Sequence, residues 1–306
     1  METFFILFFK VIPLYALILL GFTIGKYLKL SKDTLTTILI FVISPVVIFN
    51  GLLITHLSFS ILTLPVIFFL VSCFMCLVFY IVASKIWTNS TKNILAFTSG
   101  TGNTGYFGLP VAIALLGENI SGLVIMCVLG VVLFENSLGY YITARGNFTA
   151  KQSVIKLLKL PTLYACIVGV IVNLLGINLG QTYFEYASYF KGAYILLGMM
   201  IISIAISNIS INSIDLKFLS LSFLAKFIIW PVMIAIIIFF DKNIFHMYSN
   251  EIYKVMIIMS VVPLAANTVS LATLLNAQPE KASLAVLLST IFALGYIPLI
   301  AFIFLR

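Results

Sequence analysis

Long apolar runs separated by short polar connections dominate the chain. A helix that crosses a bilayer needs about 20 mostly apolar residues, and the connections carry charged and turn residues, as in Lys29–Asp33 and Trp87–Lys92. The pattern predicts an all-α polytopic membrane protein with ten transmembrane helices. We place them at 4–25, 34–55, 61–86, 92–117, 120–143, 154–175, 187–209, 217–240, 252–276 and 281–304.

The two halves of this pattern resemble each other. A polar connector at about 144–152 divides the chain into 1–145 and 146–306, each with five predicted spans. Lys10-Val-Ile-Pro-Leu-Tyr15 in the first span is similar to Lys159-Leu-Pro-Thr-Leu-Tyr164 in the sixth. Because each half has an odd number of spans, the second half enters the membrane from the opposite side. We therefore expect two inverted five-helix repeats.

Two predicted spans are interrupted at matching positions. Gly100-Thr-Gly-Asn-Thr-Gly-Tyr-Phe-Gly-Leu-Pro110 interrupts the fourth span, and Val262-Pro-Leu-Ala-Ala-Asn-Thr268 interrupts the ninth. Lipid offers no hydrogen-bond partners, so irregular backbone at membrane depth survives only inside protein or against a water-filled cavity. Paired broken helices are typical of the substrate sites of transporters. The sequence therefore predicts a binding site where spans 4 and 9 cross at their breaks.

Composition and charge agree with a membrane protein. The chain is 62% hydrophobic and 8% charged, whereas about a quarter of the residues in a soluble domain are charged. Eleven of the 17 Lys and Arg residues fall in or beside the odd-numbered loops. This bias predicts that those loops are cytoplasmic and that both termini lie outside. The net charge of +8 is then loop charge, and no nucleic-acid partner is expected.

The interruption motif resembles a known family. Gly102-Asn-Thr-Gly-Tyr-Phe-Gly-Leu-Pro110, with Pro263-Leu-Ala-Ala-Asn267 and Leu287-Leu-Ser-Thr290, is similar to the auxin efflux carrier family, which includes plant PIN-type carriers and bacterial malate and malonate permeases. The resemblance covers the whole chain. The long central loop of many plant members is missing, which favours a bacterial protein of the cytoplasmic (inner) membrane.

That resemblance implies a fold like those of the bile-acid symporters and the sodium/proton antiporters. Spans 1, 2, 6 and 7 would form a scaffold, and spans 3–5 and 8–10 a transport domain that moves against it like an elevator. A homodimer through the scaffold helices is likewise implied by the resemblance alone.

The residues at the predicted crossing suit an anion. Half-helix N-termini carry a partial positive charge of about +0.5, and both arginines of the chain lie outside the predicted spans. A site built from dipoles and amides therefore fits better than an arginine clamp. An alternative is that the asparagine amides only satisfy backbone groups freed by the breaks. The predicted substrate-binding residues are Asn103, Thr104, Gly105, Asn267, Thr268 and Asn50, and Gly102, Pro110 and Pro263 are predicted to shape the breaks.

Glu135 and Lys226 lie well inside predicted spans. A charge at membrane depth costs about 2.5–3.5 kcal/mol even on the mild insertion scale, so each is a candidate functional residue. We hypothesise that Glu135 binds and releases a coupling proton and that Lys226 is its ion-pair partner. The alternatives are a static charge pair and a glutamate that faces a water-filled space.

The sequence thus predicts a secondary active transporter of a small organic anion, a mono- or dicarboxylate such as malate or malonate, coupled to protons or sodium. No cofactor or metal is expected, and no enzyme activity, because H-E-x-x-H and G-x-S-x-G motifs are absent. Gly100, Gly102 and Gly105 match G-x-G-x-x-G but lack the strand that a dinucleotide site requires. The remaining alternatives are a channel-like protein and a membrane receptor that binds a small carboxylate without transporting it.

Overall fold

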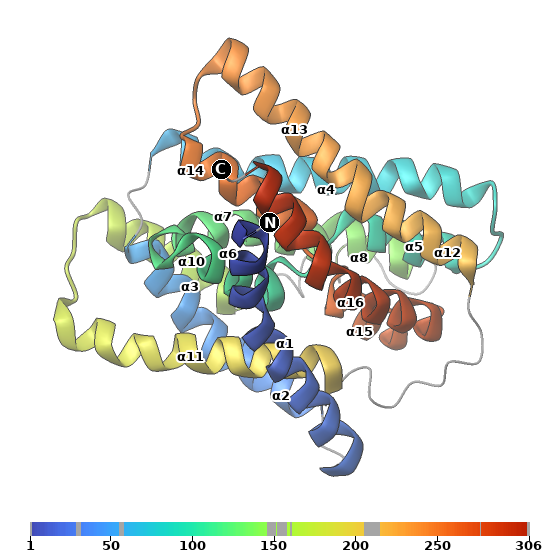
Figure 1. Cartoon of the computed structure of the whole chain (residues 1–306), viewed down its shortest axis with the longest axis horizontal. Helices are drawn as coiled ribbons and strands as arrows, with labels where there is room; N and C mark the ends of the chain where they lie inside the picture. Colours follow the sequence, from blue (N-terminus) through green and yellow to red (C-terminus); the bar gives the residue numbers. More distant parts are fainter. Residues whose placement is uncertain are drawn as a thin grey trace.

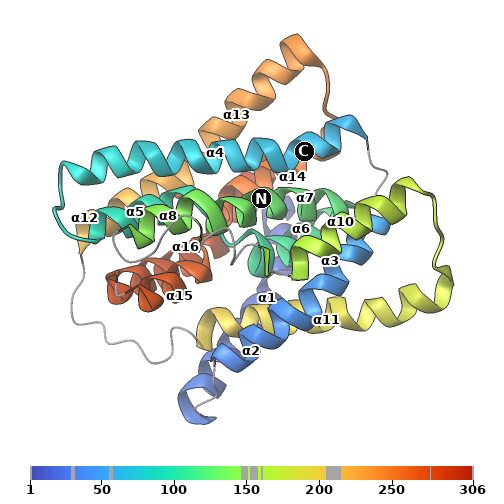
Figure 2. The same cartoon turned by 180° about the vertical axis from the view of Figure 1, so that it is seen from behind.

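The computed structural model describes residues 2–28, 32–54, 58–145, 151, 158–159, 161–204, 215–275 and 277–304. Over these residues the chain forms helices joined by short turns, without a strand, as the apolar pattern predicted. Figures 1 and 2 show helices crossing one another at many angles instead of forming one parallel bundle. The predicted connector at 144–152 and the start of the predicted sixth span lie largely outside the described residues.

The helices follow the predicted spans closely. In the first half they are α1 (Glu2–Leu28), α2 (Lys32–Ile38), α3 (Ser44–Leu53), α4 (Phe59–Ser84), α5 (Thr91–Gly100), α6 (Leu109–Leu116), α7 (Ser121–Phe134) and α8 (Tyr140–Ala144). In the second half they are α10 (Pro161–Leu174), α11 (Gly180–Ile204), α12 (Leu216–Phe223), α13 (Trp230–Phe240), α14 (Asn250–Val261), α15 (Ala266–Leu274) and α16 (Pro279–Phe304).

Several helices run on through wider π-helical turns, which are enriched at functional sites. These turns are η1 (Leu39–Ile43), η2 (Thr104–Gly108), η4 (Glu135–Gly139), η5 (Leu224–Ile229) and η6 (Asp241–Phe245), and the short turn η3 (Glu118–Ile120) is a 3₁₀-helix.

Six helical runs among the described residues are long and apolar enough to cross a membrane. They are Phe8–Leu28, Phe59–Ser84, Glu118–Ala144, Leu216–Phe245, Asn250–Val269 and Pro279–Phe304. Phe41–Leu53 and Tyr164–Leu174 are shorter apolar helices. The protein is therefore a multi-pass membrane protein by composition and helix length, and the layout of ten spans in two inverted repeats stays a prediction.

One predicted boundary was wrong. Helix α11 begins at Gly180 instead of at about 187. Gly180 has a positive φ of 78°, which ends the preceding turn. The first turns of the helix carry exposed polar residues such as Gln181 and Glu185, which the hydropathy pattern assigned to a loop.

Most helices can be assigned by their contacts to two groups, which are themselves joined, most extensively by α1 against α16. Helices α1, α3, α10 and α11 contact one another, and the Asn173 amide of α10 donates to the carbonyl oxygens of Leu52 and Leu53 in α3, at 2.8 and 3.2 Å. Glycine at position 21 lets α1 approach α11 closely, because a Cβ there would lie 2.5 Å from the Met200 carbonyl oxygen. The second group contains α4, α5, α7, α8 and α12 to α16.

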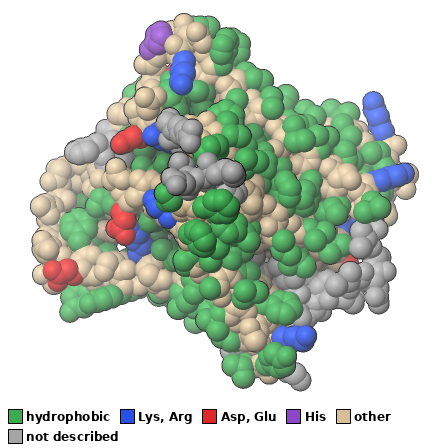
Figure 3. Space-filling view, viewed as in Figure 1, with side chains coloured by type: hydrophobic (Ala, Val, Ile, Leu, Met, Phe, Trp, Pro, Cys, Tyr) green, Lys and Arg blue, Asp and Glu red, His purple; other side chains and the backbone are tan. Residues whose placement is uncertain are grey.

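Many large apolar side chains lie on the surface. Figure 3 shows them spread over one face, with only a few charged side chains among them. Large apolar residues are strongly exposed along the long helices, such as Phe59 at 77% and Ile81 at 61% of α4. A soluble protein rarely exposes contiguous apolar patches of more than a few hundred Å², so this surface suits contact with lipid.

Candidate functional site

The chain leaves the helical conformation at both predicted interruptions. Helix α5 ends at Gly100, Thr101 is extended (φ −122°, ψ 170°), and Asn103 is also non-helical before η2 begins at Thr104. In the second half, α14 ends at Val261, Val262 is extended, and α15 begins at Ala266. The first break is shorter than the predicted 100–110, because Thr104–Gly108 forms a π-helical turn that continues into α6.

The two breaks cross each other in the protein interior. The backbone N–H of Asn103 donates to the carbonyl oxygen of Pro263 at 2.8 Å. The N–H of Leu264 donates to the Ser289 hydroxyl at 3.1 Å. These bonds satisfy backbone groups that lost their helical partners, as a break at membrane depth requires.

The two prolines have different roles. Pro263 lies in the non-helical segment between α14 and α15, and its carbonyl makes the bond between the breaks. Pro110 lies at the start of α6, directly after the π-helical turn η2, where it cannot donate a backbone hydrogen bond to the preceding turn. Of these two predicted break-shaping residues, only Pro263 lies in a break.

A cavity of about 410 Å³ opens beside the crossing. Its wall contains Gly102, Asn103, Thr104 and Gly105 from the first break and Asn267 from the start of α15. Of the other predicted binding residues, Asn50 on α3 and the fully buried Thr268 are not in the wall. The remaining wall residues are Ser44, Ile48, Phe97, Tyr106, Ile125, Val128, Leu129, Val131, Val132, Glu135, Asn136, Tyr140, Thr162, Tyr194, Ala265, Ala266 and Leu271.

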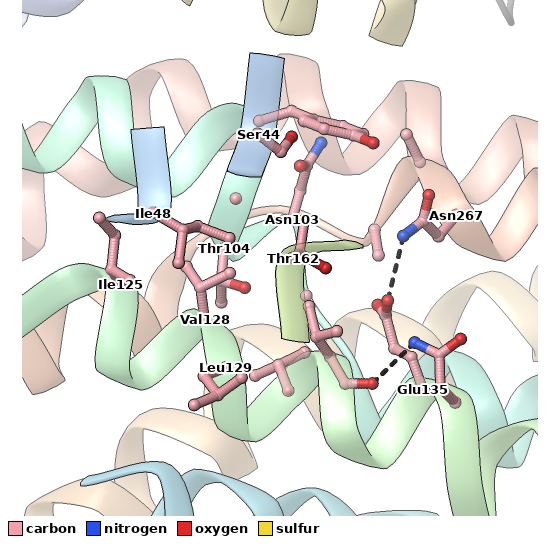
Figure 4. Close-up of a pocket in the computed structure, with 18 of the residues that line it drawn as sticks. Ser44, Ile48, Asn103, Thr104, Ile125, Val128, Leu129, Glu135, Thr162 and Asn267 are labelled. Carbon is pink, nitrogen blue, oxygen red and sulfur yellow. Dashed lines mark hydrogen bonds between the residues drawn. The ribbon is translucent and has the colours of Figure 1, made fainter. Parts of the chain in front are cut away.

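The cavity is divided into an apolar and a polar end. Figure 4 shows apolar side chains gathered at one end, the Glu135–Asn267 pair at the other, and Asn103 between them. The apolar end is formed by Ile48, Ile125, Val128 and Leu129.

Asn103 carries a free hydrogen-bond donor into this space. Its side chain is 3% exposed, and its Nδ2 has no hydrogen-bond partner among the described residues. A buried polar group without a partner costs about 1–3 kcal/mol. The Nδ2 group of Asn103 therefore satisfies no backbone acceptor among the described residues.

Glu135 connects the two breaks. It is the first residue of η4 and is 9% exposed. One carboxylate oxygen accepts a hydrogen bond from the Thr101 hydroxyl in the first break. The other accepts a bond of 3.0 Å from Nδ2 of Asn267 at the second break, and Figure 4 shows this bond as a dashed line.

Lys226 contacts the crossing at a different point. Its side chain, on η5, is 1% exposed, and its Nζ lies 4.6 Å from the centre of the Trp230 ring. A Cβ at Gly102 would overlap this Nζ, so the ammonium group lies directly against the first break.

The predicted ion pair between Lys226 and Glu135 is not formed. The ion pairs in the described part of the chain are Lys191–Glu118 at 3.0 Å and Lys281–Asp215 at 2.9 Å. The hydropathy pattern predicted that both residues lie at membrane depth, but it cannot predict toward which neighbouring helix each side chain points.

Sequence reasoning missed several residues of the site. Thr101 contacts Glu135 directly, although it lies in the segment that was predicted to be broken. Ser44, Thr162 and Tyr194 reach the wall from α3, α10 and α11. Single hydroxyl residues within apolar helices are common, so no sequence signal separated these three from ordinary packing residues.

An uncharacterized transporter of Methanocaldococcus jannaschii is 30% identical to this chain over 149 residues, which are 47% of this chain and 48% of the relative. The match therefore spans about half the length of that relative. A family model described as membrane transport protein matches residues 6–301. The chain belongs to this membrane transport protein family, the auxin efflux carrier family that its broken-helix motif resembles.

Proposed function

We propose that this protein is a secondary active transporter that carries a small organic anion, bound in the cavity where the two breaks cross. The observation that carries the proposal is the buried, unpartnered amide of Asn103 in the wall of that cavity. Family membership supports transport as the general function. The geometry of the cavity supports binding at this place and an anion as the substrate.

Helix dipoles favour a negative charge at this point. The helical segments that follow the two breaks begin at Thr104 and Ala266, and residues at both starts line the cavity. The first N–H groups of a helix lack acceptors within the helix, and its N-terminus carries a partial positive charge of about +0.5. A carboxylate placed between these N-termini and the Asn103 amide would be stabilised without a buried arginine.

The rest of the wall supports a singly charged substrate. The described residues of the cavity wall include no Lys, Arg or His, and the end opposite Glu135 is apolar. A second carboxylate, as in malate or malonate, would meet no cationic side chain among these wall residues, and beside Glu135 it would be repelled. The cavity therefore fits a monocarboxylate with an apolar body better than a dicarboxylate.

The position of the cavity between the helix groups supports an elevator-type movement. Ser44, Thr162 and Tyr194 come from the group formed by α1, α3, α10 and α11, whereas the breaks belong to the other group. Sliding the second group along the first would carry the breaks and their substrate across the membrane while the wall formed by α3, α10 and α11 stays in place.

Uptake into proteoliposomes tests this function. Labelled mandelate, malate and malonate are offered to purified protein with imposed pH, sodium or voltage gradients, and protein-free liposomes correct for passive entry. We expect saturable uptake, strongest for mandelate, that is lost in Asn103→Ala. Binding without uptake would instead support a receptor, and flux that does not saturate would support a channel. If none of the three acids is bound or taken up, the proposal is overturned.

A further inference from the structure

We propose that Glu135 is a tethered carboxylate that occupies part of the anion site when substrate is absent, and that each substrate anion enters together with one proton, which neutralises Glu135 and releases the amide of Asn267. This inference rests on the proposed transport of a carboxylate. It adds the coupling ion, the stoichiometry and the residue that links the proton to the substrate.

The carboxylate of Glu135 accepts hydrogen bonds from both breaks. Both donors to its carboxylate belong to the breaks, Thr101 to the first and Asn267 to the second. The Asn267 amide, which would be expected to bind a substrate carboxylate, is therefore already bound to a carboxylate of the protein. The Asn103 amide in the same wall has no such partner. The empty site thus has one donor free and one donor occupied.

The negative charge of a bound substrate would be close to the negative charge of Glu135. A substrate carboxylate that binds to Asn103 shares one cavity with Glu135. Two carboxylates that share a buried site cannot both stay ionised at low cost, so one of them takes a proton. Protonation of Glu135 removes the repulsion and weakens its attraction for the Asn267 Nδ2 group, which then turns to the substrate.

Among the described residues, no cation forms an ion pair with Glu135 that could take the place of this proton. Glu135 belongs to neither of the ion pairs in the described residues, and Lys226 lies against Gly102 and Trp230. Helices α4, α5, α7 and α8 pack against η4. The other titratable or charged side chains of the cavity wall are Tyr106, Tyr140 and Tyr194. Those of the packed helices are Cys73, Cys76 and Tyr80 on α4, Lys92 on α5, Cys127 on α7, and Tyr141 and Arg145 at α8, where Arg145 donates to Tyr80.

The stoichiometry follows from these charges. The empty site contains one negative charge, on Glu135. The loaded site contains the substrate carboxylate, again one negative charge, and a neutral Glu135. One proton and one monocarboxylate are taken up together, and both leave when the site opens on the other side. Transport of a monocarboxylate is therefore electroneutral and driven by a pH gradient, without a requirement for sodium.

Proton uptake on binding tests this coupling directly. Purified protein is placed in weakly buffered detergent solution with a pH indicator, and mandelate, malate and malonate are added in turn while binding is followed by calorimetry. For the acid that binds most tightly, we expect about one proton taken up per molecule bound at pH 8, and an apparent Kd that rises about tenfold per pH unit on the alkaline side. Binding without proton uptake anywhere between pH 5.5 and 8.5 would overturn the inference and leave the proposed function standing. If none of the acids binds, the proposed function itself fails.

Two variants sharpen the test. Glu135→Gln keeps the size of the side chain but holds no proton, so we expect binding without proton uptake, a Kd independent of pH, and exchange of labelled acid without accumulation along a pH gradient. Glu185→Gln removes an exposed carboxylate of α11 and is expected to behave as the unmodified protein. Proton uptake that persists unchanged in Glu135→Gln would assign the proton to another group and overturn the inference. The measurement on unmodified protein needs no variant, so it decides the question even if Glu135→Gln folds poorly.

Discussion

At the scale of single residues, Asn103 and Asn173 show how one residue type serves two purposes. Asn173 donates to two backbone carbonyls and ties α10 to α3, whereas Asn103 Nδ2 donates to none of the described residues. Asn173→Ala leaves carbonyls without their donor, at a cost of about 1–3 kcal/mol. Removing a group that makes no bond costs little.

This contrast predicts opposite outcomes for the two alanine variants. We expect Asn103→Ala to keep the thermal midpoint of the protein within about 1 °C while its affinity for the transported acid falls at least about tenfold, which corresponds to about 1.4 kcal/mol. Asn173→Ala should lower the midpoint by several degrees and keep the affinity of the folded fraction. Scanning fluorimetry and equilibrium binding measure both quantities. A large loss of stability in Asn103→Ala would show that its amide holds the break together, and the assignment to substrate would fail.

The glycine of the first break is the second residue-scale prediction. A Cβ at Gly102 would overlap Lys226 Nζ and approach Val262 Cγ2 to 3.2 Å. We expect Gly102→Ala to push the Lys226 side chain away from Trp230. The thermal midpoint should fall by several degrees and uptake should fall several-fold. Gly192→Ala on α11 is the control, because its Cβ meets nothing within 4 Å and alanine favours a helix by about 1 kcal/mol. Equal behaviour of the two variants would contradict the close packing at the crossing.

At the scale of elements, the ion pair of Asp215 and Lys281 fastens α12 to α16. Asp215 precedes α12 and accepts the N–H of Phe218 at 3.0 Å, and Lys281 donates to it at 2.9 Å and to Thr91 of α5 at 3.3 Å. Burial alone would raise the pKa of Asp215, but the bonds from Lys281 and from backbone N–H groups outweigh burial and hold this pKa below its usual 3.8.

The lowered pKa gives a stability that depends on pH. A carboxyl group whose pKa is lower in the folded state stabilises the protein above its unfolded value and loses that contribution as the pH falls through the folded value. Asp215→Asn keeps a helix-capping residue and removes the charge. We expect its thermal midpoint to be lower by roughly 1–3 °C at pH 7 and pH 5, and we expect this difference to shrink as the pH falls below 3.8 toward the pKa of the folded state. A difference that stays constant down to pH 3 would assign the effect to lost hydrogen bonding and not to charge.

The helices and their breaks could be predicted from the sequence, but the directions in which side chains point could not. The Gly, Asn and Pro residues at 100–110 and 262–268 marked both breaks, because these residues disfavour regular helix. The π-helical turns that begin at Glu135 and contain Lys226 gave no such signal. Each such turn shifts the angular position of later residues around the helix, so hydropathy found the depth of these charges and not their partners.

At the scale of the whole molecule, the cavity joins helices that are distant in the sequence. The crossing of the breaks was predictable from two matching interruptions. The opposite wall was not, because the sequence does not distinguish the hydroxyl residues Ser44, Thr162 and Tyr194 from ordinary packing residues. An anion site built from backbone N–H groups and amides leaves a fainter sequence signal than one built from arginines, since the groups that attract the charge are present in every helix.

A cross-linking experiment tests whether the two helix groups move relative to each other. Lys191 on α11 pairs at 3.0 Å with Glu118 on η3, which connects α6 to α7. This contact joins the group of α1, α3, α10 and α11 to the group that contains the breaks. Glu118 is exposed, with 78% of its side chain accessible, and such exposed pairs contribute only about 0–1 kcal/mol. The pair is therefore weak enough to separate during a transport cycle, and a covalent bond at the same place should prevent that separation.

We expect a bismaleimide bridge between Glu118→Cys and Lys191→Cys, in a background with the four native cysteines replaced, to reduce uptake at least about tenfold while binding of the acid persists. The control joins Asp215→Cys to Lys281→Cys, a pair of similar distance that lies within the second group, and its bridge should leave uptake close to that of the unbridged protein. If both bridged proteins transport normally, the groups do not slide, and the substrate must pass by local opening of the cavity. If both bridges stop transport, the second group does not move as one body. A rigid group that moves the breaks past a fixed wall predicts one result only. The bridge between positions 118 and 191 stops uptake, and the bridge between positions 215 and 281 leaves uptake unchanged.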